Sequence, residues 1–123
     1  MPTPSNIYVA VVDDDESLCR SLSRLLRADG IHPVTYTSAE AFLADTKHPQ
    51  FDCLVLDVQL GGMSGIELLR RLSAVKKKTP AIFITAHDGP ETRDEALAAG
   101  GAAYFHKTDS GADVLASIRR LVG

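Results

Sequence analysis

Carboxylates, a hydroxyl and an ammonium each follow directly after a short apolar run in this 123-residue chain. In chain order they are Asp13, Asp14 and Asp15, then Asp57, Thr85 and Lys107. Carboxylates held within a few ångströms of one another repel, so such a cluster either raises a pKa or binds a cation. Oxygen ligands without histidine or cysteine favour a hard ion, and a few carboxylates with waters suit Mg²⁺. With a metal, a hydroxyl and a lysine beside it, Asp57 could act as the nucleophile of a phosphoryl transfer.

Short apolar runs alternate with amphipathic stretches along the chain, which predicts five strand–helix units. The runs that predict strands cover about residues 7–12, 33–36, 52–56, 81–84 and 102–105. This alternation predicts an α/β fold with a parallel sheet covered by helices on both faces. The first, third and fourth runs are the most apolar and should be central, with the second and fifth at the edges. Ligands of open α/β sheets bind at the carboxyl ends of the strands, where the six residues stand.

Polar residues and glycines predict where the helices begin and end. Asp15 should only cap the first helix, Ser38 should cap the second, and Ser110 should cap the last. Gly30 should end the first helix. The apolar faces of the third and last helices should be formed by Ile66, Leu69, Leu72 and Val75, and by Val114, Leu115, Ile118, Leu121 and Val122.

The composition argues against several classes of protein. The net charge is −3, and the one basic run, Lys76–Lys78, follows a predicted helix, so no nucleic-acid footprint is indicated. Cys19 and Cys53 match no zinc spacing, and reduced cysteines suit a cytoplasmic location. No apolar stretch approaches the roughly 18 residues that a membrane span needs. Residues 1–6 lack the features of a signal peptide and are expected to form a flexible tail.

Four motifs in order resemble those of response-regulator receiver domains, the CheY-like modules of two-component signalling. They are Val11–Asp14, Leu56–Gly65, Ile84–Ala86 and Tyr104–Lys107. Each motif alone is weak evidence for the resemblance, but all four in order on the predicted strands are specific evidence for it. The resemblance implies a flavodoxin-like (βα)5 three-layer sandwich, with a five-stranded parallel sheet of order 2-1-3-4-5 and a receiver domain over 7–123.

The resemblance also implies a role for the acidic residues and Gln59. Asp57 would accept a phosphoryl group from a phosphohistidine donor, on a sensor histidine kinase or a histidine phosphotransfer protein. Asp14 and Asp57 would ligate Mg²⁺ directly, with Mn²⁺ as an alternative. Asp13 would assist, through water, and Gln59 would offer its backbone carbonyl to the metal. The domain would not be an enzyme beyond this self-catalysed chemistry and its own dephosphorylation.

The remaining site residues would carry the response. Lys107 would pair with Asp57 and with the phosphoryl group, and Thr85 would donate its hydroxyl to that group. Tyr104 resembles the aromatic switch of the family, which turns inward when Thr85 moves. The face of the fourth helix, fifth strand and fifth helix would then signal to an output partner, with the chain a monomer or a phosphorylation-dependent dimer.

Four positions depart from the family pattern or could tune it. Thr108 stands where the family usually has proline, and a cis bond before a non-proline residue costs about 3–4 kcal/mol, so the Lys107–Thr108 bond should be trans. The family often has proline where Gly61 stands, and the glycine should make this loop looser. Gln59 and His87 occupy positions that would set the lifetime of the phosphoryl group by contacting or shielding the attacking water.

Two other functions fit the same fold class. A flavin-binding electron carrier would need a Ser/Thr/Gly-rich, amide-lined loop after the first strand, whereas Asp13, Asp14 and Asp15 make that loop acidic. A metal-dependent phosphohydrolase would need a general base, and no second acid is placed for it unless His87 serves.

Overall fold

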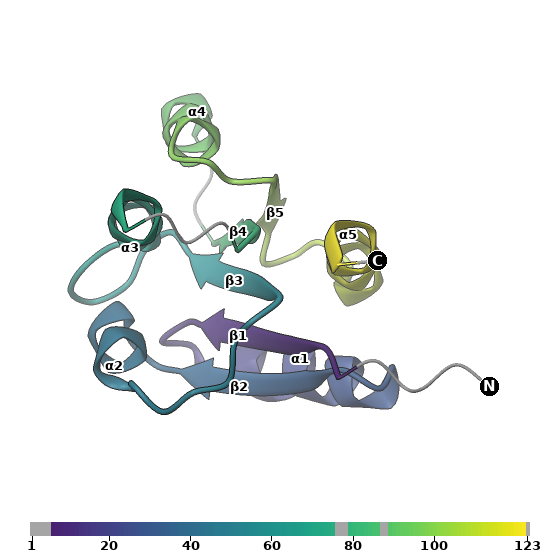
Figure 1. The fold of residues 1–123 in the computed structure, drawn as a ribbon. Coiled ribbons are helices and arrows are strands. Elements are labelled where there is room, and N and C mark those ends of the chain that lie inside the picture. The colour runs from purple at the N-terminus through teal and green to yellow at the C-terminus, as the bar shows by residue number, and fades with distance from the viewer. Residues whose placement is uncertain (1–5, 76–78, 87–88, 123) are drawn as a thin grey trace.

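The computed structural model describes residues 6–75, 79–86 and 89–122. Strands and helices alternate along these residues (Figure 1). The elements are β1 (Tyr8–Val12), α1 (Glu16–Ala28), β2 (His32–Tyr36), α2 (Ala39–Ala44), β3 (Cys53–Asp57), α3 (Gly65–Ala74), β4 (Ala81–Thr85), α4 (Pro90–Ala98), β5 (Ala103–His106) and α5 (Gly111–Val122). The predicted alternation is therefore confirmed.

The strands form one five-stranded parallel sheet in the order β2-β1-β3-β4-β5. Every residue of β3 and β4 is buried, and so is every residue of β1 after Tyr8. The edge strands β2 and β5 are largely half-buried or exposed. The order and the assignment of centre and edges agree with the prediction, because only strands covered on both faces and flanked on both sides need continuous apolar runs.

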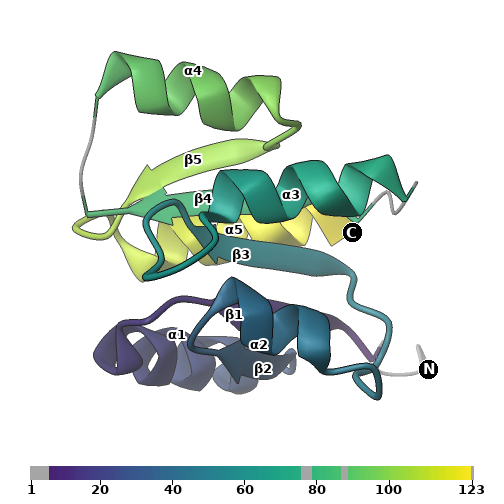
Figure 2. The same cartoon turned by 90° about the vertical axis from the view of Figure 1, so that its left-hand side faces the viewer.

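Helices cover both faces of the sheet, and two apolar layers lie between them (Figures 1 and 2). Successive side chains of a strand point to opposite faces. In β3, Leu54 and Leu56 therefore pack with α2 and α3, whereas Cys53 and Val55 pack with α1 and α5. Figure 2 shows α2, α3 and α4 on the near face and α1 and α5 on the far face. This is the predicted three-layer sandwich.

The helix ends follow the local signals in the sequence. The Asp15 carboxylate accepts the N–H groups of Ser17 and Leu18 and begins α1. Gly30 follows α1 with φ +79°, a left-handed conformation that glycine adopts without strain. At the second helix the Ser38 hydroxyl accepts the N–H of Ala41, 3.0 Å away.

Two residues assigned to the predicted apolar faces of helices are exposed. Val75 directly follows α3 and is 65% exposed, and Leu121, in the last turn of α5, is 36% exposed. Helical spacing identifies which residues share a face but not whether another element lies opposite each turn, so these two predictions were wrong. No helix within the described ranges is both long and apolar enough to cross a bilayer.

Candidate functional site

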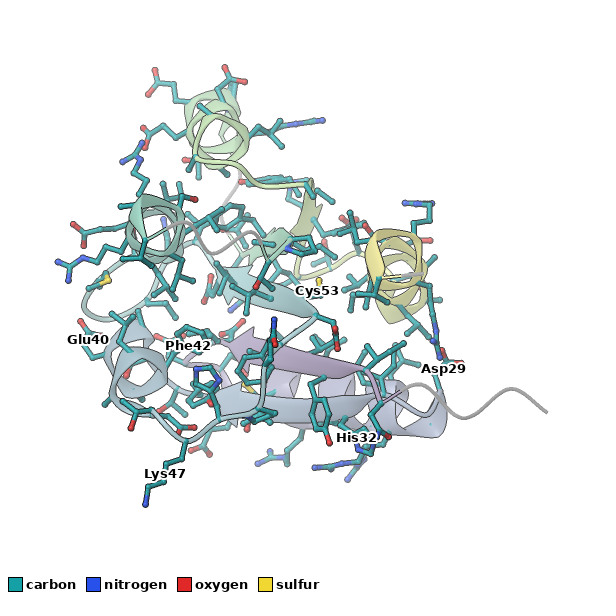
Figure 3. The ribbon with its side chains drawn as sticks, viewed as in Figure 1. Asp29, His32, Glu40, Phe42, Lys47 and Cys53 are labelled. Carbon is teal, nitrogen blue, oxygen red and sulfur yellow. The ribbon has the colours of Figure 1, made fainter. Side chains whose placement is uncertain are left out.

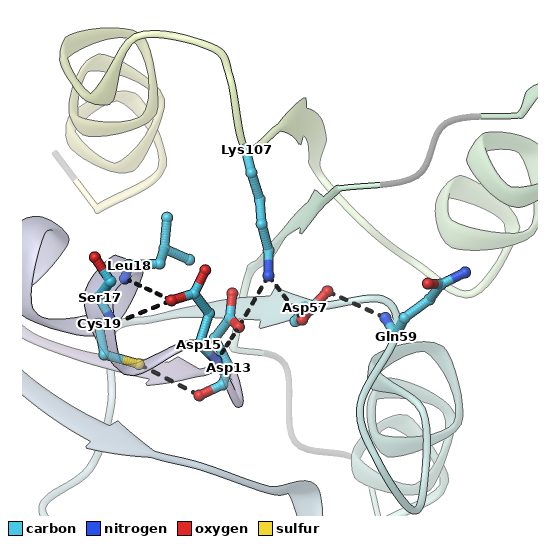
Figure 4. Close-up of polar contacts among 8 residues, drawn as sticks. All are labelled: Asp13, Asp15, Ser17, Leu18, Cys19, Asp57, Gln59 and Lys107. Carbon is cyan, nitrogen blue, oxygen red and sulfur yellow. Dashed lines mark hydrogen bonds and ion pairs between the residues drawn. The ribbon is translucent and has the colours of Figure 1, made fainter.

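The carboxyl ends of three strands bring Lys107 into contact with two buried carboxylates (Figure 4). The Lys107 Nζ lies 3.0 Å from Asp13 Oδ1 and 3.1 Å from Asp57 Oδ2. Asp13 follows β1, Asp57 ends β3, and Lys107 follows β5. Asp13 is 0% exposed and Asp57 is 2% exposed, so the contact is largely shielded from water. The sheet order creates it, since 94 and 50 residues separate the partners along the chain.

Backbone amides hold both carboxylates in place. The N–H of Asp15 donates to Asp13 Oδ1 at 2.8 Å, and the N–H of Gln59 donates to Asp57 Oδ1 at 3.1 Å. Both Asp57 oxygens are therefore engaged, one by Gln59 and the other by Lys107. A carboxylate fixed at both oxygens is pre-oriented for chemistry or for metal binding.

The same carboxylates could hold a metal ion. One carboxylate oxygen from each of Asp13, Asp14 and Asp57 lies within 4.8 Å of the others. Asp14 is exposed, and Asp13 Oδ2 is buried with no hydrogen-bond partner among the described residues. A buried acceptor without a partner is costly, and a divalent cation would satisfy it. The oxygen-only donor set fits a hard ion such as Mg²⁺.

Burial sets the protonation behaviour of this cluster. The pKa of Asp57 is raised to about 6, mainly by burial and also by the nearby Asp13 charge, while the hydrogen bonds from Lys107 and Gln59 act to lower it. Burial acts to lower the pKa of Lys107, but its bonds to Asp13 and Asp57 outweigh this and the pKa is raised. One ammonium thus faces two buried carboxylates, an imbalance that a bound cation would correct.

Without divalent cations, we expect an Asp57→Asn variant to be more stable than the parent at about pH 7.5, by roughly 1–3 kcal/mol. The folded-state pKa of about 6 lies above the ordinary 3.8, so the native state binds this proton more tightly than the unfolded chain. The resulting stabilisation is present at low pH and is lost as the pH rises through about 6. Urea unfolding of both chains in a chelator, from about pH 4 to 7.5, measures the gap. A gap that stays constant over this range would contradict the prediction.

Thr85 and Tyr104 lie on one face of the sheet, on adjacent strands. Tyr104 is paired with Phe83 of β4, and Thr85 lies two residues beyond Phe83. Residues two apart in a strand share a face, so the side chains of Thr85 and Tyr104 are diagonal neighbours. Thr85 is fully buried, and the Tyr104 hydroxyl oxygen is shielded from solvent. The Thr85 carbonyl also accepts the N–H of Lys107 at 2.8 Å, which ties this strand end to the lysine.

The other predicted site residues are placed only in part. Gln59 is exposed beside Asp57, and His87 lies outside the described residues. The Lys107–Thr108 bond is trans, as predicted. Gly61 has open space around it, in keeping with a loop that is not packed at that point.

Two residues that support the site were missed from the sequence. Gly65 approaches the backbone of the predicted phosphoacceptor so closely that a Cβ would lie 2.1 Å from the Asp57 carbonyl oxygen. The glycine directly after the Ser64 cap, where helices seldom need one, was the available signal. Glu40, on α2 (Figure 3), accepts the N–H of Met63 at 2.9 Å and so holds the β3–α3 loop. No local pattern predicts a contact across 23 residues.

Similar proteins of known sequence are response regulators. Response regulator protein TmoT of Ectopseudomonas mendocina is 35% identical over 111 residues, which are 90% of this chain and 50% of that protein. Transcriptional regulatory protein FixJ of Azorhizobium caulinodans is 34% identical over 120 residues, which are 98% of this chain and 57% of that protein. The chain thus spans about half the length of these curated relatives.

Solved structures share the fold. A response regulator receiver protein from Burkholderia phymatum is 43% identical with a TM-score of 0.83, over 96% of each chain. The crystal structure of FixJ-N is 34% identical with a TM-score of 0.86, over 96% of this chain and 94% of that one.

The family model described as response regulator receiver domain matches residues 9–119. Domains of this family are signalling domains, not enzymes in the ordinary sense, and response regulators work with histidine kinases and output domains. This result argues against the flavin carrier and the phosphohydrolase that the sequence left open. The chain belongs to the response regulator receiver domain family.

Proposed function

We propose that Asp57 accepts a phosphoryl group from a phosphohistidine donor and that the domain, residues 7–123, relays this event to a partner. The observation that carries the proposal is the Lys107 ammonium, 3.0 and 3.1 Å from two buried carboxylates, beside a buried Asp13 oxygen without a partner among the described residues. An Asp57 oxygen would attack phosphorus, the phosphorus–nitrogen bond would break, and the donor imidazole would leave with the electron pair. Lys107 would then neutralise part of the charge on the transferred group.

Asp14 and Asp57 would hold Mg²⁺ directly, with Asp13 assisting through water and Gln59 through its carbonyl; Mn²⁺ would be an alternative. When bound, the metal supplies positive charge to the phosphoryl oxygens. The chain itself supplies orientation, because the Gln59 N–H and the Lys107 ammonium hold the two Asp57 oxygens. The raised pKa of Asp57 is consistent with a site that needs a cation to keep the carboxylate ionised.

Thr85 and Tyr104 would form the switch. The Thr85 hydroxyl would donate to the phosphoryl group, and the shielded Tyr104 hydroxyl would settle in the space beside it. Their place as diagonal neighbours on one face supports this coupling. The surface of α4, β5 and α5 would present the change to an output partner, with the protein acting in the cytoplasm as a monomer or a phosphorylation-dependent dimer. Gln59 and His87 would set how long the phosphoryl group lasts.

Incubation with acetyl phosphate and Mg²⁺ tests the proposal. We expect the intact mass to rise by one phosphoryl group, and we expect no rise when a chelator removes the metal. Asp57→Asn should abolish the gain, because it replaces the carboxylate oxygen that would attack phosphorus. Asp113→Asn, which removes an exposed carboxylate of α5, should gain the group as the parent does. A mass gain that persists in Asp57→Asn would refute the assignment.

A further inference from the structure

The turn between β5 and α5 is closed by an aspartate side chain. The N–H of His106 donates to Asp109 Oδ2 at 2.8 Å, and the N–H of Asp109 donates back to the His106 carbonyl at 3.0 Å. Lys107 and Thr108 lie between these two residues, so both hydrogen bonds enclose the lysine. A short aspartate side chain that accepts a backbone N–H in this way takes the place of a strand or helix bond.

The Asp109 carboxylate accepts the last backbone N–H of β5, that of His106. The next N–H along the chain, that of Lys107, donates to the Thr85 carbonyl of β4 at 2.8 Å. Two hydrogen bonds between His106 and Asp109 and one from Lys107 to β4 therefore hold the backbone around Lys107.

Two simpler roles do not account for Asp109. The Ser110 hydroxyl accepts the N–H of Ala112 at 3.1 Å, so α5 has its own cap. The His106 Nδ1 lies 3.6 Å from Asp109 Oδ2, and both side chains are about 40% exposed, a geometry in which an ion pair contributes little. The remaining role for Asp109 is to hold the turn that carries Lys107.

We propose that Asp109 is a positioning residue, which holds the β5–α5 turn so that the Lys107 ammonium stays between Asp13 and Asp57. The inference rests on the proposed function for its effect on phosphoryl transfer. A fixed Lys107 backbone lowers the conformational entropy that must be lost to hold this long side chain between the two carboxylates. A shift of about 1 Å in a group that stabilises a transition state can cost up to roughly a hundredfold in rate.

Two variants separate the geometry of Asp109 from its charge. Asp109→Asn keeps a short side-chain oxygen but loses the charge, and Asp109→Glu keeps the charge but moves it one carbon further out. We expect the asparagine variant to be phosphorylated by acetyl phosphate within about twofold of the parent rate, and the glutamate variant about tenfold more slowly at saturating Mg²⁺. Asp109→Ala should behave as the glutamate variant does.

A spectroscopic measurement tests the positioning without relying on phosphorylation. The side-chain methylene signal of Lys107, assigned by its loss in Lys107→Met, should keep its chemical shift in Asp109→Asn. It should move towards the position of solvated lysines in Asp109→Glu and Asp109→Ala. An unchanged Lys107 signal in both of these variants would overturn the inference, and so would an asparagine variant as impaired as the glutamate variant. A parent that takes up no phosphate would overturn the proposed function alone, because the Lys107 signals still decide the role of Asp109.

Discussion

A Lys107→Met variant should lose about 2–4 kcal/mol of stability at about pH 7.5 without divalent cations. Methionine removes the ammonium that contacts Asp13 and Asp57 at 3.0 and 3.1 Å and leaves two carboxylates, 0% and 2% exposed, facing each other. Removal of one partner from a buried ion pair costs more than the pair contributes, since the remaining charge stays desolvated. The pKa of Asp57 is already raised to about 6 with Lys107 present, so the loss of the Lys107 ammonium should raise the pKa of Asp57 further.

Chemical unfolding in a chelator measures this loss of stability, and three further experiments test its cause. Lowering the pH to about 5 should recover part of the stability, because Asp57 then takes up its proton. Adding Asp57→Asn to Lys107→Met should recover most of it, because the charge itself is removed. Lys47→Met, which alters an exposed lysine, should change stability by less than about 0.5 kcal/mol. Equal losses in the Lys107 and Lys47 variants would show that the buried cluster is not the cause.

A Gly65→Ala variant should lose roughly 1–3 kcal/mol, towards the upper end of the range for overpacking. The new Cβ would lie 2.1 Å from the Asp57 carbonyl oxygen and 3.0 Å from the Asp57 carbonyl carbon, and neither backbone atom can turn aside as a side chain could. Alanine has the higher helix propensity by about 1 kcal/mol, so the clash must exceed this gain before any loss is seen. Because the displaced group is the backbone of Asp57, phosphorylation by acetyl phosphate should slow as well.

Gly61→Ala is the matched control for this prediction. No atom lies within 4 Å of a Cβ at Gly61, and its φ is not left-handed. The substitution should be neutral or stabilising by about 0.4–1 kcal/mol, through the entropy of the unfolded chain. Thermal and urea unfolding of the two alanine variants against the parent make the comparison. If both variants unfolded like the parent, the close approach at Gly65 would carry no energetic weight.

Local information in the sequence determined the order and type of the elements. The apolar runs predicted all five strands, and their degree of apolarity separated central from edge strands. Asp15 and Ser38 predicted two helix starts, because a cap bonds to backbone within three residues of itself. The sequence also placed Asp13, Asp14, Asp57, Thr85 and Lys107 directly after the predicted strands. Because parallel strands end at the same edge of a sheet, these residues were expected to lie together. Burial at helix ends was beyond this reasoning, as Val75 and Leu121 show.

Contacts between distant segments decided the rest. The distances from Lys107 to Asp13 and Asp57, and the raised pKa of Asp57, exist only once three strands lie side by side and exclude water. The close approach of Gly65 to the Asp57 backbone likewise depends on how α3 leaves its loop. The sequence by itself therefore determined which groups meet at the edge of the sheet. Only the tertiary structure decided how closely they meet and how strongly they interact, because desolvation and contact distance are properties of the packed chain.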